Sequence, residues 1–152
     1  MGLFDNLGKW GIFGAVMGLL GAILISIISL IGIGIFQPEV PTMLTAIPGL
    51  IALAGILVFV MAIISGFISG LIAGIINNVL FRKVRNRLYK IYGSFLTWSI
   101  IGILFTSVMA SSLIGINTLD IGIILQQMVI LFVEVWGTIQ IFGVLGLQKN
   151  LP

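Results

Sequence analysis

The stretch LFRKVRNRLYKIY, residues 80–92, is the one strongly charged region in the interior of this 152-residue chain. Five of the seven Lys and Arg residues lie in it: Arg82, Lys83, Arg85, Arg87 and Lys90. Long apolar runs flank it on both sides. Because charged side chains are costly to place in hydrocarbon, this stretch must meet water. The rest of the chain is therefore organised around a basic, water-facing segment.

The composition indicates an integral membrane protein. Hydrophobic residues make up 60% of the chain and charged residues only 7%, whereas a soluble domain has about 25% charged residues. A helix of about 20 apolar residues crosses the roughly 30 Å hydrocarbon core of a bilayer. The sequence therefore predicts an all-α, polytopic membrane protein, a single transmembrane helical domain over residues 1–152. Its four spans are expected at residues 10–36, 49–79, 93–114 and 121–147.

The connections predict how the spans alternate. Pro38, Pro41 and Pro48 interrupt the helical pattern between the first two spans, because proline lacks a backbone N–H and restricts the preceding residue. With four crossings, Lys9, the basic stretch and Lys149 lie on one side of the membrane. That arrangement satisfies the positive-inside rule. We expect an up-down-up-down four-helix bundle with both termini cytoplasmic.

Two interpretations of the basic stretch remain open. At about 100° per residue, its apolar and basic residues fall on opposite faces, which predicts an amphipathic helix lying on anionic lipid between the second and third spans. A positively charged loop that only fixes orientation explains the same residues. In both cases the cations contact lipid head groups. The expected partner is the lipid bilayer and not a nucleic acid, because the cations lie at the ends of apolar spans.

Small residues recur every four positions in the first two spans. The first series is Gly14, Gly18 and Ala22, and the second is Gly66, Gly70 and Gly74. Glycine costs about 1 kcal/mol relative to alanine inside a helix, so its regular repetition indicates close helix packing of the glycine-zipper kind. We expect the chain to pack through these ridges as a homo-oligomer or with other membrane subunits.

Glu134 is the only ionisable residue within a predicted span. A charge at the bilayer centre costs about 2.5 to 3.5 kcal/mol, so such a residue usually has a partner or a function. Counting inward from the span ends, or around the helix, brings six polar residues to its depth or its face: Gln127, Thr138, Ser26, Ser65, Thr106 and Ser107. This cluster predicts either interhelical hydrogen bonds of about 0.6 to 2 kcal/mol each or a relay for protons or cations.

The chain contains no cysteine and no histidine. Disulfides, thiolate ligands and imidazole bases are therefore excluded, and no phosphate-binding loop or nucleophile-elbow motif is present. We expect no enzymatic activity, no cofactor and no metal. The predicted function is that of a structural or accessory membrane subunit that packs with itself or with partners in a larger assembly, such as a cellular or viral membrane coat. The alternative is a proton- or ion-translocating subunit that uses Glu134.

Overall fold

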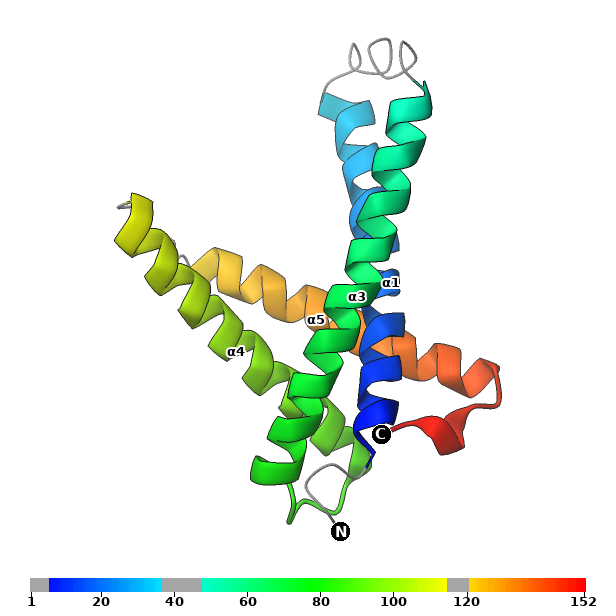
Figure 1. Cartoon of the computed structure of the whole chain (residues 1–152), viewed down its shortest axis with the longest axis vertical. Helices are drawn as coiled ribbons and strands as arrows, with labels where there is room; N and C mark the ends of the chain where they lie inside the picture. The colour runs from blue at the N-terminus through cyan, green and yellow to red at the C-terminus, as the bar shows by residue number, and fades with distance from the viewer. Residues whose placement is uncertain (1–5, 37–47, 115–120) are drawn as a thin grey trace.

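The computed structural model describes residues 6–36, 48–114 and 121–152, which fold into four long helices and one short turn of 3-10 helix (Figure 1). These elements are α1 (Leu7–Phe36), α3 (Pro48–Leu80), α4 (Arg87–Ile114), α5 (Ile121–Val144) and η1 (Gln148–Asn150). Each long helix contains an apolar segment of sufficient length to cross a membrane: Leu7–Ser29, Leu53–Leu80, Arg87–Met109 and Ile124–Val144. The prediction of an all-helical, multi-pass membrane protein is confirmed at this level.

The basic stretch forms a turn followed by the start of α4. Helix α3 ends at Leu80, and residues 81–86 are not helical. The Asn86 Oδ1 atom accepts hydrogen bonds from the backbone N–H groups of Leu88 at 3.0 Å and Tyr89 at 3.5 Å. An asparagine that accepts these bonds caps a new helix. The amphipathic-helix interpretation of residues 80–92 is therefore not confirmed: residues 81–86 form a non-helical connection, as the loop interpretation expects, and α4 begins six residues earlier than residue 93.

Helices α1 and α3 form an antiparallel hairpin whose backbones come into close contact (Figure 1). A methyl group at Gly14 would lie 2.7 Å from the Cα atom of Gly70 and would also strike the carbonyl oxygen of Gly66. At Gly18 it would lie 3.0 Å from the Cα atom of Gly66. Because the approaching atoms belong to backbone, no side-chain movement could make room. The two glycine ridges thus face each other within one chain.

Helix α5 runs steeply across the α1–α3 hairpin near its middle, and α4 diverges from the hairpin toward the end of α4 (Figure 1). Two contacts between α1 and α5 define this crossing. Gly21 of α1 faces the side chain of Glu134, and Gly137 of α5 faces the side chain of Leu20. The described helices therefore do not have the nearly parallel axes of a regular bundle. The order of crossings through a membrane remains a prediction.

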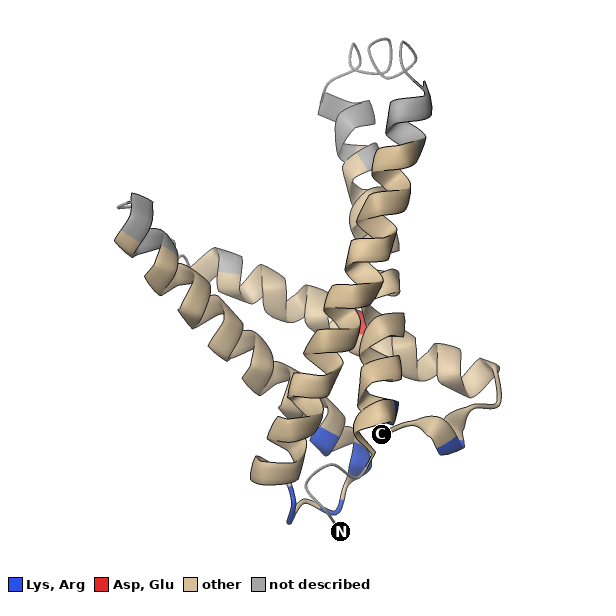
Figure 2. Cartoon of the chain, in the orientation of Figure 1, with Lys and Arg blue, Asp and Glu red and all other residues tan. Residues whose placement is uncertain are grey.

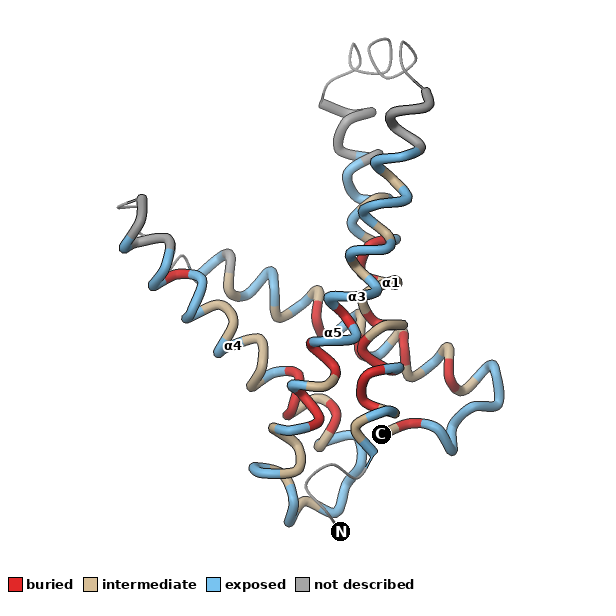
Figure 3. Tube along the Cα trace, in the orientation of Figure 1, coloured by how far each residue is buried: buried red, intermediate tan, exposed pale blue. Residues whose placement is uncertain are grey.

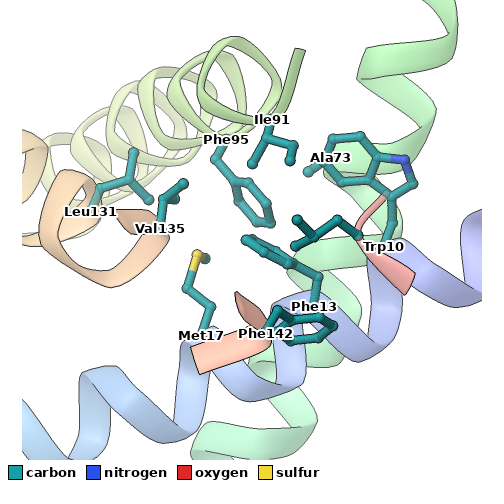
Figure 4. Close-up of a cluster of buried hydrophobic side chains, with 10 residues drawn as sticks. Trp10, Phe13, Met17, Ala73, Ile91, Phe95, Leu131, Val135 and Phe142 are labelled. Carbon is teal, nitrogen blue, oxygen red and sulfur yellow. The ribbon is translucent and has the colours of Figure 1, made fainter. Parts of the chain in front are cut away.

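The buried core lies where all four helices meet, toward the basic end of the molecule (Figure 3). Phe13 is at its centre, with ring centroids 5.8 Å from Phe95 and 5.7 Å from Phe142 (Figure 4). Trp10 lies 5.9 Å from Phe95, and such aromatic pairs contribute about 0.5 to 1.5 kcal/mol beyond the area they bury. Outside this core, the described helices expose mainly apolar side chains.

Candidate functional site

Glu134 lies near the middle of α5, where this helix crosses α1 (Figure 2). Its side chain is half-buried and occupies the space beside Gly21. A methyl group at Gly21 would lie 2.9 Å from Cδ of Glu134 and would overlap Oε1. Gly21 therefore lets the carboxyl group lie against the α1 backbone. The four-residue spacing of the glycine ridge did not identify Gly21, because it falls outside that register.

A pocket of about 450 Å³ adjoins this crossing. Its polar lining comes from all four long helices and comprises Ser26, Ser65, Ser69, Ser99, Gln127 and Glu134. Four of these, Ser26, Ser65, Gln127 and Glu134, belong to the polar cluster expected from the sequence. Apolar residues such as Met17 and Ile130 form much of the remaining wall. The result is a small polar site inside an apolar part of the molecule.

The hydroxyl groups around this pocket donate their hydrogen bonds within their own helices. Ser26 donates to the Ala22 carbonyl oxygen at 2.7 Å, and Ser65 donates to that of Ala62 at 3.1 Å. Thr138 is buried and does not line the pocket, and it donates to the backbone oxygen of Glu134 at 2.7 Å, not to its carboxyl group. Their oxygen lone pairs can still accept bonds. These donations therefore satisfy the hydroxyls without linking one helix to another.

Thr106 and Ser107 do not line the pocket. Thr106 is exposed and donates to the Gly102 carbonyl oxygen at 2.7 Å, whereas Ser107 is buried. Both lie on the part of α4 that diverges from the hairpin (Figure 1). Counting from the span ends predicts depth but not helix divergence. The structure therefore does not bring these two residues to Glu134.

The remaining small residues of the ridges also lie at contacts within the chain. A methyl group at Gly74 would lie 2.9 Å from both the Leu7 side chain and the Trp10 ring. At Gly70 it would strike the Trp10 carbonyl oxygen. Ala22 is buried and lines the pocket beside Glu134. The ridges are thus occupied by the α1–α3 contact, and any partner subunit must use other faces.

The Lys and Arg residues gather at one end of the molecule, away from Glu134 (Figure 2). Four of them line a second pocket of about 330 Å³: Lys9, Arg85, Arg87 and Lys90. The other two head-group candidates, Arg82 and Lys83, are exposed and do not line this pocket. Of the five predicted head-group contacts, Arg85, Arg87 and Lys90 thus line this pocket and Arg82 and Lys83 do not, and the structure adds Lys9 to the lining set.

Among the described residues, no group of three or more His, Cys, Asp or Glu side chains could hold a metal ion. Two buried side-chain oxygens, Asn77 Oδ1 and Ser94 Oγ, have no hydrogen-bond partner among the described residues. Both lie in the basic half of the molecule, on α3 and α4.

Comparison of the chain with protein-family models, with curated proteins and with solved structures gives no match.

Proposed function

We propose that this protein is a structural or accessory membrane subunit that associates with copies of itself, with the outer face of α5 as the contact. The observation that supports this proposal is a stripe of exposed residues on α5: Gln126, Val129, Val133, Trp136 and Gln140. They alternate in steps of three and four, which is the spacing of a helix-pairing seam. The glycine ridges of α1 and α3 face inward, so a partner would use another face, and we choose this stripe because it carries an amide near each end.

The polar ends of this stripe explain why it would need a partner in lipid. Gln126 and Gln140 are exposed and lie within the membrane-spanning segment of α5. An amide in hydrocarbon is costly unless it is hydrogen-bonded. Glutamine has both donors and acceptors, so each amide can bond to its equivalent in a second copy whose α5 runs parallel to it. A symmetric pair of copies would therefore give the amides of both Gln126 and Gln140 a hydrogen-bond partner.

Cysteine crosslinking tests this contact cleanly, because the natural chain has no cysteine. Val133→Cys in the seam should form a disulfide between two copies in native membranes. Val135→Cys is the matched control, since Val135 is fully buried in the core of the same chain. Equal crosslinking at both positions, or at neither, would contradict a specific α5 seam.

The second candidate function is translocation of protons or cations. The observation that favours it is the pocket that Glu134 shares with Ser26, Ser65 and Gln127. A carboxyl group with hydroxyl and amide oxygens around it offers the hard oxygen ligands that a proton or a small cation requires. Glu134 would be the titrating group, and liposome flux measurements on a Glu134→Gln variant test this role.

For orientation, we propose that the basic end faces the cytoplasm. The start of α1, the α3–α4 turn and η1 all carry Lys or Arg residues and lie at this end (Figure 2). An excess of Lys and Arg near span ends marks the cytoplasmic side. Both ends of the chain would then be cytoplasmic, with the α1–α3 and α4–α5 connections on the opposite side.

A further inference from the structure

The pocket at the basic end is formed by residues that are far apart in the sequence. Lys9 comes from the first turns of α1, Arg85 from the turn before α4, and Arg87 and Lys90 from the start of α4. The end of the chain forms another part of its wall through Leu151 and Pro152. The pocket therefore exists only when these separate segments are folded together.

Hydrogen bonds to the backbone hold these segments in place. Arg87 donates from Nε to the Pro152 oxygen at 2.8 Å and from Nη1 to the Gln148 oxygen at 3.4 Å. Lys9 Nζ donates to the Lys149 oxygen at 3.2 Å. Leu151 is buried in the hydrophobic core. Since Arg has five N–H donors and Lys three, most of their donors remain available to a ligand.

The charged side chains that line this pocket are all cationic. Four cationic side chains line it, and no Asp or Glu is among its described lining residues. Like charges held together repel one another, so an anion in the pocket would stabilise the arrangement. Arg and Lys bind phosphate through short, charge-assisted hydrogen bonds, and the planar guanidinium group of Arg can bind two of its oxygens at once. A phosphate group fits this donor set.

The pocket also lies at the ends of two helix segments that are long and apolar enough to cross a membrane, which is where lipid head groups are expected. The membrane-spanning segments of α1 and α4 begin at Leu7 and Arg87, beside the pocket residues Lys9 and Lys90. We propose that this pocket is a specific site for the phosphate of an anionic phospholipid, distinct from the general attraction that the exposed Arg82 and Lys83 exert on a charged membrane.

Lipid titration of the full-length protein tests this site. The purified chain, in phosphatidylcholine nanodiscs or mixed micelles, is titrated with phosphatidylglycerol, and bound lipid is counted by native mass spectrometry. Arg85→Gln/Lys90→Gln should weaken phosphatidylglycerol binding about tenfold, because two charge-assisted contacts are lost. Arg82→Gln/Lys83→Gln removes the same charge at residues that do not line the pocket and should change binding less than about twofold, because only a screened surface attraction is lost.

A charge-conserving pair, Arg85→Lys/Lys90→Arg, should retain most of the binding and so separates loss of charge from loss of fold. Equal weakening by the pocket pair and the exposed pair would overturn the proposal, because it would indicate only a diffuse surface field. Wild-type protein that retains phosphatidylglycerol no better than phosphatidylcholine would also overturn it. Inorganic phosphate serves as the competitor. If it displaces the lipid at equal concentration, the occupant is a soluble phosphate and the lipid assignment fails.

Discussion

The carboxyl group of Glu134 on α5 occupies the space that Gly21 on α1 leaves free, since a methyl group at Gly21 would lie 2.9 Å from Cδ of Glu134. The only ionisable residue predicted to lie within a span is therefore seated against a glycine. This pairing fixes the point at which α5 crosses the hairpin. It also means that Gly21 and Glu134 should depend on each other energetically.

Relative to an unhindered Gly→Ala change in a helix, Gly21→Ala should cost the folded protein up to about 1 kcal/mol, because the carboxyl end of the flexible Glu134 side chain must move away from the added methyl group. The double variant Gly21→Ala/Glu134→Ala should recover most of this loss, which is the non-additivity expected of residues in contact. Unfolding in mixed detergent micelles measures both. Gly102→Ala is the control, since nothing lies within 4 Å of a methyl group there. Identical behaviour of the two single variants would contradict the contact.

Gly70→Ala should destabilise the protein by about 1 to 3 kcal/mol, the usual cost of overpacking. The added methyl group would strike the Trp10 carbonyl oxygen and lie 3.0 Å from the Gly14 Cα atom, so the two helices must separate. Gly55→Ala is the matched control on the same helix, with nothing within 4 Å. It should be neutral or slightly stabilising, because alanine favours helix. The unfolding of the monomer in detergent is the measurement, and equal stability of both variants would refute the close approach.

Gln126→Leu/Gln140→Leu should convert the proposed oligomer to smaller species on native gels or in crosslinking. The change keeps the side-chain size and removes the interhelical hydrogen bonds, each of about 0.6 to 2 kcal/mol in a membrane. Gln148→Leu makes the same replacement in η1, outside the span, and should leave the assembly intact. An unchanged oligomer in the double variant would exclude these amides as the contact.

Glu134→Gln should abolish proton or cation flux in liposomes if the pocket is a relay, because an amide cannot titrate while it keeps much of the hydrogen-bonding shape. Thr138→Val is a suitable control: Thr138 bonds to the Glu134 backbone and not to its carboxyl group, so flux should persist. A leak that is the same in wild type and Glu134→Gln would remove the translocation role and leave the assembly role standing.

The two ends of the spans should differ in access to membrane-impermeant thiol reagents. In cells, Asn86→Cys, in the described and exposed α3–α4 turn, should react only after the cytoplasmic side is opened. Asp120→Cys, in the α4–α5 connection outside the described residues, should react from the external side. Labelling of both from the same side would contradict four crossings with a cytoplasmic basic end.

The helices themselves could be predicted from the sequence because they depend on local properties. Apolar length predicts four membrane-crossing helices, since hydrocarbon forces each segment to satisfy its own backbone hydrogen bonds. Pro48 lies at the start of α3, where a proline is tolerated. Helix α4 begins at Arg87 after the Asn86 cap, a break that was not predicted from the sequence. The amphipathic pattern of residues 80–92 suggested one continuous helix, because helical periodicity alone does not show where one helix ends and the next begins.

Which helix faces which was decided by the tertiary structure. The glycine spacing predicted close packing, but the pairing of Gly14 with Gly66 and Gly70 inside one chain depends on how two helices fit together, which no single-helix period contains. The same holds for Gly21 against Glu134, and for Lys9 beside Lys90. Hydropathy fixes how deep a residue lies in a membrane, whereas the contacts around it depend on the crossing of helices that are distant in sequence.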